Sequence, residues 1–422
     1  MKLESIALHS GYTSEPTTRA ATTPIYQTTS FTFDNTQHGA DLFDLKVVGN
    51  IYSRIMNPTN AVLEQRLAEM EGGIASLALA SGMAAITYAV QCITRVGDNI
   101  VSANQLYGGT YNLFAHTLPQ MGINTKLVDI GNFSEVEAAI DENTKALYCE
   151  SIGNPLGNVV DLDTLGKIAK KHHIPLIVDN TVPTPYLCRP IDFGADIVIH
   201  SLTKYIGGHG TTIGGVIIDS GKFDWAKDKK KYPMLNEPDP SYHGVVYTEA
   251  LGPAAFIGRC RVVPLRNTGA ALSATSAFQI MQGLETLGLR MERHCENATA
   301  LAKFLKSHPK VSWVNYAALE DDKYYDYCQK ITKGRASGII SFGIKGGETA
   351  GAKFIDALQM ILRLVNIGDA KSLACHPAST THRQLGPEEL KAAGVSPDMV
   401  RISVGIEHID DIIADVSQAL VA

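Results

Sequence analysis

A lysine follows a short apolar stretch in the middle of the chain. Residues 197–199 (Ile-Val-Ile) predict a buried strand, and Lys204 comes next, after the hydroxyl residues Ser201 and Thr203. Glycines dominate the residues that follow, 207–215. Most lysines are solvated surface residues. This one, at the end of a buried strand beside hydroxyls and flexible backbone, is placed to use its amine as a nucleophile.

An amine at this position can form a Schiff base with a carbonyl cofactor, and the two hydroxyls can hold a phosphate beside it. Pyridoxal 5'-phosphate (PLP) needs both an aldehyde partner and a phosphate anchor. Asp179 ends the predicted strand 175–179, one strand–helix unit before Lys204, so the two side chains can face one ligand. A carboxylate there would keep a pyridinium nitrogen protonated. A helix cap or a loop salt bridge is the plainer alternative for Asp179.

An earlier stretch also suits an anion. Residues 76–80 predict a short buried strand, and Ser81-Gly-Met83 leads into a helix from Ala84 to about Ile93. Unpaired backbone N–H groups point outward at the start of such a helix, so a phosphate can bind there. Many α/β turns share this pattern without binding a ligand.

Four further residues have both a chemical and a plainer interpretation. Tyr107, at a strand end before two glycines, could stack on a flat ring or pack in an interface. Arg401, within the predicted strand 400–404, either pairs with an internal carboxylate or forks onto the carboxylate of a substrate. Tyr52 and Arg54 lie in a polar segment, where an arginine is ordinarily a solvated charge.

The composition is that of a large globular enzyme. The 422 residues are 45% hydrophobic, and the net charge of −6 argues against nucleic acid or an anionic membrane as the main partner. The seven cysteines are widely spaced without a C-x-x-C pair, and the histidines lack an H-E-x-x-H spacing, so we expect neither disulfides nor a catalytic metal. Neither a membrane-spanning apolar run nor the apolar core of a signal peptide occurs, and we expect a cytoplasmic protein.

The order of predicted elements indicates three parts. Residues 1–58 lack helical periodicity and are expected to form an extended N-terminal arm that wraps a neighbouring subunit or domain. Residues 59–265 alternate strands and helices as far as about residue 220, which predicts an α/β domain with a mostly parallel central sheet and helices on both faces. Residues 221–264 are interpreted as an insertion at the surface or at the active-site rim. Residues 266–422 begin with a long helical stretch and continue as a smaller α+β C-terminal domain.

Taken together, these motifs resemble the Cys/Met-metabolism family of PLP enzymes, the cystathionine γ-synthase-like group of fold-type I. The resemblance covers nearly the whole chain. Within the family it is greatest to the O-acetylhomoserine sulfhydrylases, as the insertion and Leu284-Glu-Thr-Leu287 indicate. The matching stretches are Tyr52-Ser-Arg-Ile-Met-Asn-Pro-Thr59, Ala80-Ser-Gly-Met-Ala84, Tyr107-Gly-Gly109, Glu150-Ser-Ile-Gly-Asn-Pro155, Val178-Asp179, His200-Ser-Leu-Thr-Lys-Tyr205, Ser372 to His376 and Arg401.

The resemblance implies a PLP-dependent transferase. Lys204 would carry the cofactor, Asp179 would pair with the ring nitrogen, and Tyr107 would stack on the ring and take part in catalysis. The other residues implied to bind the cofactor are Ser81, Gly82, Met83, Asn154, Thr181, Ser201 and Thr203, with Tyr52 and Arg54 reaching the phosphate from a neighbouring subunit. The residues implied to orient the substrate are Asn154, Ser372 and Arg401, with Arg401 on the α-carboxylate. The resemblance also implies a homotetramer built of two active dimers.

The implied reaction is a γ-replacement in methionine biosynthesis. The substrate amine would displace Lys204, which would then take the Cα proton while the pyridinium held by Asp179 absorbs the charge. Loss of a Cβ proton would expel the γ-acyloxy group. Sulfide, or a thiol such as methanethiol, would add at Cγ to give homocysteine or methionine.

Three alternatives stay open on the sequence. The enzyme could be a cystathionine γ-synthase, an O-succinylhomoserine sulfhydrylase or a γ-lyase, although Gly109 stands where the methionine γ-lyase branch has a cysteine. A nucleotide-dependent oxidoreductase would need a G-x-G-x-x-G turn, which Ala80-Ser-Gly-Met83 does not supply. A non-catalytic relative would be expected to have lost Lys204 or Asp179.

Overall fold

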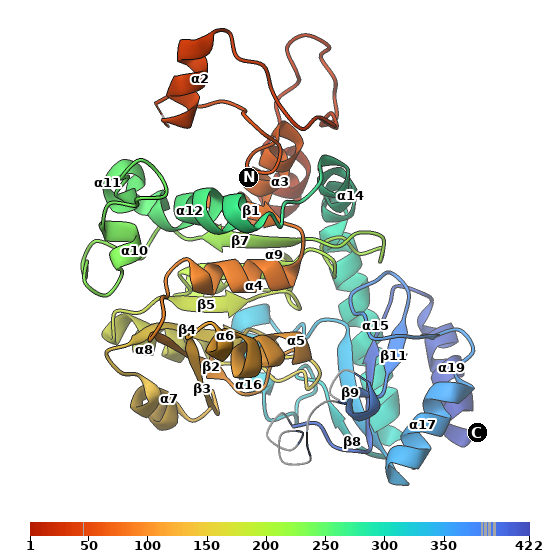
Figure 1. Cartoon of the computed structure of the whole chain (residues 1–422). Helices are drawn as coiled ribbons and strands as arrows, with labels where there is room; N and C mark the ends of the chain where they lie inside the picture. The colour runs from red at the N-terminus through yellow and green to blue at the C-terminus, as the bar shows by residue number, and fades with distance from the viewer. Residues whose placement is uncertain (45, 381–382, 384–385, 387–389, 391–393) are drawn as a thin grey trace.

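In a computed structural model of the chain, the described residues form two β-sheets (Figure 1). The structure describes residues 1–44, 46–380, 383, 386, 390 and 394–422. In that part of the chain, one sheet has the strand order β1-β7-β6-β5-β4-β2-β3 and the other β10-β11-β12-β9-β8. The strands of the larger sheet are β1 (Ala75–Leu79), β2 (Asn99–Ala103), β3 (Asn124–Val128), β4 (Thr144–Glu150), β5 (Leu176–Asp179), β6 (Ile197–Ser201) and β7 (Gly215–Asp219).

The larger sheet is mostly parallel, as predicted. β7 is antiparallel to both of its neighbours, β1 and β6, whereas the pairs among β2, β3, β4, β5 and β6 are parallel. The sequence analysis missed β7, because its five residues follow directly on the glycine-rich segment. The central strands β4 and β7 are buried along their whole length, and β7 has three consecutive apolar residues, 216–218.

Helices cover both faces of this sheet. The chain steps from β1 through β2 to β3 in one direction and returns through β4 and β5 to β6 in the other. Because parallel crossovers are right-handed, α4, α5 and α6 cover one face and α7, α8 and α9 the other. The bounds are α3 (Pro58–Glu71), α4 (Gly82–Gln91), α5 (Gly108–Asn112), η1 (Leu113–Thr117), α6 (Leu118–Gln120), α7 (Phe133–Ala139), α8 (Leu162–Lys171), α9 (Thr184–Leu187) and η2 (Pro190–Phe193).

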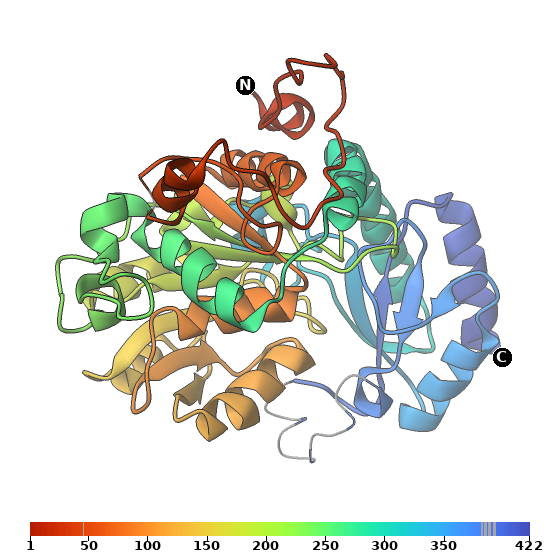
Figure 2. The ribbon, with the colours of Figure 1, turned by 45° about the horizontal axis from the view of Figure 1, so that its top comes forward.

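The N-terminal arm is less irregular than expected. It contains α1 (Leu3–His9), which packs on α3, and α2 (Thr36–Phe43), whose start is capped by the Asn35 side chain. Helical periodicity was not recognised in this segment, because a helix of seven or eight residues makes only about two turns. The arm projects from the body near α3 and α14, on the side away from the C terminus (Figure 2).

The insertion is a packed layer rather than part of the active-site rim. Its aromatic side chains, among them Trp225, Tyr232 and Phe256, are buried. The Tyr232 hydroxyl donates to the carbonyl oxygen of Lys145 at 3.1 Å, at the amino end of β4. The helical elements of this region are α10 (Pro233–Asn236), α11 (Tyr247–Leu251), η3 (Gly252–Ala254), α12 (Ala255–Cys260), η4 (Arg261–Leu265) and α13 (Arg266–Thr268).

The second sheet and its helices form the C-terminal part of the chain. The predicted long helical stretch divides at Thr286 into α14 and α15, and the predicted polar loop 368–377 contains strand β11, which corrects that interpretation. The domain boundaries at 58/59 and 265/266 stay a proposal. The elements are α14 (Ala274–Glu285), α15 (Leu287–Ser307), β8 (Val311–Asn315), α16 (Tyr325–Thr332), β9 (Ile339–Ile344), α17 (Gly347–Ala357), β10 (Leu362–Arg363), β11 (Leu373–Cys375), η5 (Pro377–Ser379), β12 (Met399–Ser403) and α19 (Ile409–Val421).

Candidate active site

A cavity of about 280 Å³ opens at the carboxyl ends of the parallel strands. The pairing register places Glu150 of β4 opposite Asp179 of β5, so both carboxylates point to this edge. Ten of the residues predicted from the sequence line the cavity: Ser81, Gly82, Met83, Tyr107, Asn154, Asp179, Thr181, Ser201, Thr203 and Lys204. The other lining residues are Ile86, Glu150, Ile152, Val182, Ile213, Val365, Asn366 and Ile367.

The Lys204 amine lies in this cavity as a reactive base. Its Nζ donates a hydrogen bond to Oδ1 of Asn366, and no carboxylate of the described residues lies within ion-pair distance of it. Burial, together with the positive charge of Arg401, lowers the pKa of Lys204 to about 8, against a smaller opposing effect of Asp369. An amine with such a pKa is partly neutral near physiological pH, as a nucleophile or general base requires.

Asp179 and Glu150 form a buried pair of carboxyl groups. Oδ1 of Asp179 accepts the backbone N–H of Thr181 at 3.0 Å. Burial raises the pKa of Asp179, and the hydrogen bonds from Thr181 oppose that rise. Burial and the nearby charge of Asp179 raise the pKa of Glu150 to about 8. A cation placed next to Asp179 would hold it ionised.

The start of α4 forms a cradle against the end of β6. The Ser81 side chain caps the helix by accepting the N–H of Ala84 at 3.1 Å. A Cβ on Gly82 would lie 2.8 Å from Cβ of Ser201, so the helix start and the strand end are in close contact. The first N–H groups of a helix have no partner within the helix. With the Ser201 and Thr203 hydroxyls nearby, they form a site suited to a phosphate.

Arg401, on β12 of the second sheet, lies behind the cavity wall and bonds to three of the lining residues. It is 1% exposed, and its Nη1 donates to Oδ1 of Asn154 at 3.0 Å. Its Nη2 donates to the carbonyl oxygens of Val365 and Asn366, both at 3.0 Å, and its Nε has no hydrogen-bond partner among the described residues. A buried guanidinium with a donor left over and no carboxylate partner in the described part of the chain is suited to the carboxylate of a ligand.

Besides Arg401, three predicted residues do not line the cavity of this chain. The Ser372 hydroxyl donates to Oε2 of Glu407 at 2.9 Å, and its direct role with substrate stays a prediction. Tyr52 is 40% exposed on the arm, and Arg54 donates to the carbonyl oxygen of Arg266 at 2.6 Å. Their predicted role requires a second subunit and is not tested by a single chain.

Two polar residues of the cavity were given no role from the sequence. Glu150 was noted only as the first residue of the stretch 150–155, although it ends a buried strand just as Asp179 does. Its Oε1 accepts the N–H of Tyr107 at 2.6 Å, and its Oε2 accepts the N–H of Asn154 at 3.1 Å. Asn366 lies in a loop without any motif, so nothing in the sequence marked it.

The family model described as Cys/Met metabolism PLP-dependent enzyme matches residues 4–421 of the chain. The chain belongs to this family. It is 52% identical over 418 residues to the homocysteine synthase of Schizosaccharomyces pombe, covering 99% of this chain and 97% of that protein. It is 50% identical over 422 residues to O-acetyl-L-homoserine sulfhydrylase 1 of Thermus thermophilus, covering 100% of both.

A solved structure of another relative shows the same fold. It comes from Campylobacter jejuni, is described as an O-acetylhomoserine (thiol)-lyase, and contains N'-pyridoxyl-lysine-5'-monophosphate. It is 43% identical to this Cys/Met-metabolism enzyme, with a TM-score of 0.98 and 100% of each chain covered. The predicted fold-type I architecture and the PLP dependence are thereby confirmed.

The cavity of this enzyme fits PLP. The α4 cradle suits the phosphate, Asp179 suits the ring nitrogen, Lys204 suits the aldehyde, and the 41% exposed Tyr107 offers a ring face. Within the described residues, no group of three or more His, Cys, Asp or Glu side chains is arranged to hold a metal ion. The described helices include none long and apolar enough to cross a membrane, and all seven cysteines are free thiols.

Proposed function

We propose that this enzyme replaces the acetyloxy group at Cγ of O-acetyl-L-homoserine with sulfide, giving L-homocysteine and acetate. The proposal rests on Lys204 and on the buried Arg401, which has no carboxylate partner among the described residues. Together they provide an amine and a binding group for the α-carboxylate of one amino acid. Relatives that are about half identical over their whole length are named for this reaction or its product. A thiol such as methanethiol would give methionine in the same site.

Each polar residue of the cavity then has a defined task. Arg401 binds the α-carboxylate and, through its bond to Asn154, keeps that side chain beside the substrate. Lys204, which is partly neutral because of its lowered pKa, receives the Cα proton and later returns it. PLP, when bound, supplies the electron sink for the charge that develops at Cα. Asp179 keeps the ring nitrogen of the cofactor protonated and so preserves that sink.

The acceptor side of the cavity favours a small sulfur nucleophile over cysteine. A synthase that joins cysteine must hold a second carboxylate and a second ammonium group. Among the described residues, Lys204 is the only cation that lines the cavity, and Arg401, behind the wall, is already assigned to the α-carboxylate of the first substrate. Much of the remaining wall is aliphatic, including Ile152, Val182 and Ile213. Sulfide or a small thiol needs no further charged partner, which supports the sulfhydrylase over cystathionine γ-synthase.

Gly109 supports a sulfhydrylase rather than a γ-lyase. A Cβ at this position would lie 2.6 Å from Cε1 of Tyr107 and 3.3 Å from Sδ of Met83. A cysteine here would therefore push the Tyr107 ring away from its present position. The ring position and the residue at 109 are thus coupled.

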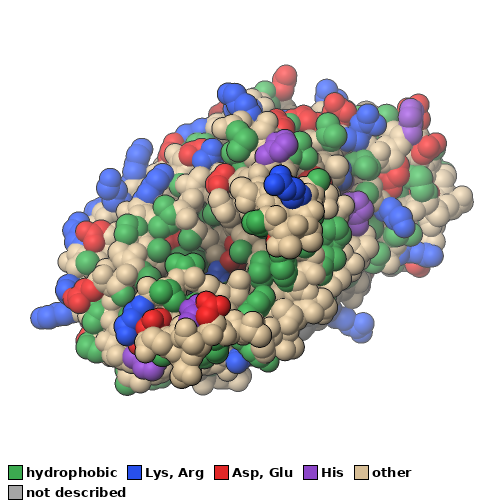
Figure 3. Space-filling model, turned by 90° about the horizontal axis from the view of Figure 1, so that it is seen from above, with side chains coloured by type: hydrophobic (Ala, Val, Ile, Leu, Met, Phe, Trp, Pro, Cys, Tyr) green, Lys and Arg blue, Asp and Glu red, His purple; other side chains and the backbone are tan. Residues whose placement is uncertain are grey.

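We further propose that the enzyme is a cytoplasmic homo-oligomer, a tetramer built of two active dimers. Several large apolar side chains of the arm are exposed, among them Ile25, Phe33, Phe43 and Val48, and hydrophobic side chains gather on the face seen from that side (Figure 3). Packing of these side chains on a second copy would allow Tyr52 and Arg54 to reach the phosphate of the partner. Sedimentation tests this arrangement, and a catalytically active monomer would contradict it.

The decisive experiment for the activity follows the leaving group and the product. Purified enzyme with O-acetyl-L-homoserine is expected to release acetate and homocysteine together, and only when sulfide is present. The same enzyme with O-succinyl-L-homoserine and cysteine is expected to form little cystathionine. Preferred turnover of that second pair would assign the enzyme to the synthase, and release of 2-oxobutyrate without sulfide would indicate a lyase.

A further inference from the structure

The side chain of Asn366 connects the catalytic lysine to a carboxylate. Its Oδ1 accepts the Nζ–H of Lys204, and its Nδ2 donates to Oδ1 of Asp369 at 2.9 Å. These two bonds fix the orientation of the amide, because an ionised carboxylate accepts only N–H or O–H donors. The amide oxygen is therefore held toward the lysine.

The loop that carries Asn366 is anchored independently of that side chain. The carbonyl oxygens of Val365 and Asn366 each accept Nη2 of Arg401 at 3.0 Å, and the N–H of Gly368 donates to the Ser403 hydroxyl at 2.9 Å. A Cβ on Gly368 would lie 2.5 Å from the backbone nitrogen of Tyr205, the residue after Lys204. The loop is thus packed directly against the backbone that presents the catalytic amine.

We propose that Asn366 is a positioning residue for the free amine of Lys204, with Asp369 fixing the orientation of its amide. The inference rests on the proposed function, in which Lys204 leaves the cofactor aldehyde and then transfers protons. The lysine has a long flexible side chain, so a free amine needs a fixed acceptor to stay within reach of Cα. Asn366 supplies that acceptor without a charge, so the amine is directed but not locked in an ion pair.

The proton transfer involves only Cα of the substrate and Nζ of Lys204. The Cα–H bond of the substrate breaks, its electron pair stays on the substrate, and the proton forms a new N–H bond at Nζ of Lys204. Return of a proton from Nζ to Cα reverses the step. In D₂O the returned hydrogen is deuterium, so exchange at Cα measures this transfer without any γ-replacement.

The test uses the PLP-loaded holoenzyme with L-norleucine in D₂O, followed by NMR of the Cα hydrogen. L-Norleucine has no leaving group, so it reports on Lys204 alone. Asn366→Ala and Asn366→Ser are expected to slow exchange by about 10- to 100-fold, since a displacement of about 1 Å can cost that much. Leu364→Ala, an exposed residue of the same segment, serves as the control and is expected to exchange within about twofold of the wild type.

Steady-state kinetics and a double variant separate positioning from a general structural effect. The KM for O-acetyl-L-homoserine is expected to change little in Asn366→Ala, because Arg401 is anchored by main-chain carbonyls, whereas kcat falls. Asp369→Asn is expected to have a smaller effect, and Asn366→Ala/Asp369→Asn no larger effect than Asn366→Ala, because Asp369 acts through Asn366.

The outcomes distinguish the two proposals. If both Asn366 variants exchange the Cα hydrogen of L-norleucine at the wild-type rate, the positioning role is overturned. It is also overturned if the wild-type enzyme does not exchange this hydrogen at all. Wild-type exchange that is slowed in both variants, without turnover of O-acetyl-L-homoserine, would support the positioning role and overturn only the proposed reaction.

Discussion

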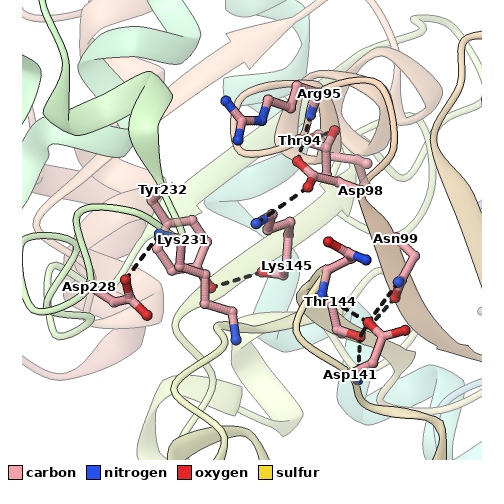
Figure 4. Close-up of polar contacts among 12 residues, drawn as sticks. Thr94, Arg95, Asp98, Asn99, Asp141, Thr144, Lys145, Asp228, Lys231 and Tyr232 are labelled. Atoms are coloured by element: carbon pink, nitrogen blue, oxygen red, sulfur yellow. Dashed lines mark hydrogen bonds and ion pairs between the residues drawn. The ribbon is translucent and has the colours of Figure 1, made fainter.

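Two lysines of the large sheet are withdrawn from solvent at opposite edges and have different partners. Lys204 lies past the carboxyl end of β6 and is hydrogen-bonded to the neutral amide of Asn366. Lys145, at the amino end of β4, is 5% exposed, and its Nζ lies 3.3 Å from Oδ1 of Asp98 (Figure 4). Burial, with no carboxylate partner, lowers the pKa of Lys204 to about 8, whereas Lys145 is paired with a carboxylate. The partner therefore decides which lysine is structural and which is reactive.

The surroundings of the two lysines extend this contrast. At the amino edge, Asp98 also accepts the N–H of Arg95 at 2.9 Å, and Asp141 accepts the Asn99 amide at 2.9 Å and the Thr144 hydroxyl at 3.0 Å (Figure 4). At the carboxyl edge, Nε of Arg401 has no partner among the described residues. The carboxylates of Asp98 and Asp141 thus find partners within the protein, whereas one donor of Arg401 is left for a ligand.

Removal of the reactive lysine has the largest expected effect on activity. Lys204→Ala is expected to lose turnover by at least about 10³-fold, because both the cofactor attachment and the proton carrier disappear. The visible absorbance band of a PLP–lysine Schiff base, near about 420 nm, is expected to vanish as well. Thermal unfolding of the variant should remain cooperative. A variant that kept the band would show that another lysine carries the cofactor.

Removal of the structural lysine should instead affect stability. Lys145→Met leaves Asp98 buried without its cation and is expected to cost about 3–5 kcal/mol in the free energy of unfolding. The absorbance band and the KM of the folded enzyme should be unchanged. The double variant Lys145→Met/Asp98→Leu should recover much of the loss, because it leaves no unpaired charge. A normal stability for Lys145→Met would remove the distinction between the two edges.

A carboxyl group at the amino edge, Asp196, is expected to make the stability of the protein depend on pH. Burial raises the pKa of Asp196, just before β6, to about 6, and its Oδ2 accepts the N–H of Leu176 at 3.0 Å. The unfolded carboxyl group ionises near pH 4, so between about pH 4 and 6 the folded state holds the extra proton and stability falls as pH rises. Asp196→Asn keeps an acceptor for the N–H without that cost.

The variant should therefore be more stable than the wild type at pH 8, by about 2 kcal/mol, and the gain should shrink as pH falls toward 4. Thermal unfolding at pH 8 and at pH 4.5 measures both values. The control is Asp192→Asn, an exposed aspartate of the preceding turn. An equal gain for Asp196→Asn at both pH values would indicate that the ionisation of Asp196 is not the cause.

The sequence could predict much of the site because one physical rule places it. Lys204 and Asp179 both follow apolar strands, and the carboxyl ends of neighbouring parallel strands meet at one edge. The same rule applies to Glu150, which ends β4 but was given no role of its own from the sequence. The short helices of the arm were missed because seven or eight residues make only about two turns, too few to show a clear period.

Asn366 and Arg401 show where sequence reasoning ends. Arg401 could be singled out, because an arginine inside an apolar strand needs a partner, but its partner could not be named. Asn366 reaches Lys204 only because the second sheet brings residues separated by 162 positions together. That placement depends on the packing of the second sheet against the first, which no local pattern records.

The smallest effect on activity is expected for Glu150, at the carboxyl edge of the sheet. Each oxygen of Glu150 accepts one backbone N–H, from Tyr107 and from Asn154. Glu150→Gln keeps the size of the side chain, but its amide nitrogen cannot accept, so one of the two segments loses its anchor. We expect kcat/KM for O-acetyl-L-homoserine to fall by about 10-fold, equivalent to about 1.4 kcal/mol, which is typical for one such bond.

The spectrum of the bound cofactor would show whether this loss is local. A small shift of the band with full cofactor content is expected, because Tyr107 moves against the ring while Lys204 and Asp179 stay in place. Glu142→Gln, an exposed glutamate before β4, provides a matched control and should leave kcat/KM unchanged. If the kcat/KM of Glu150→Gln equalled that of the control, Glu150 would contribute to stability but not to activity, as the amino-edge groups do.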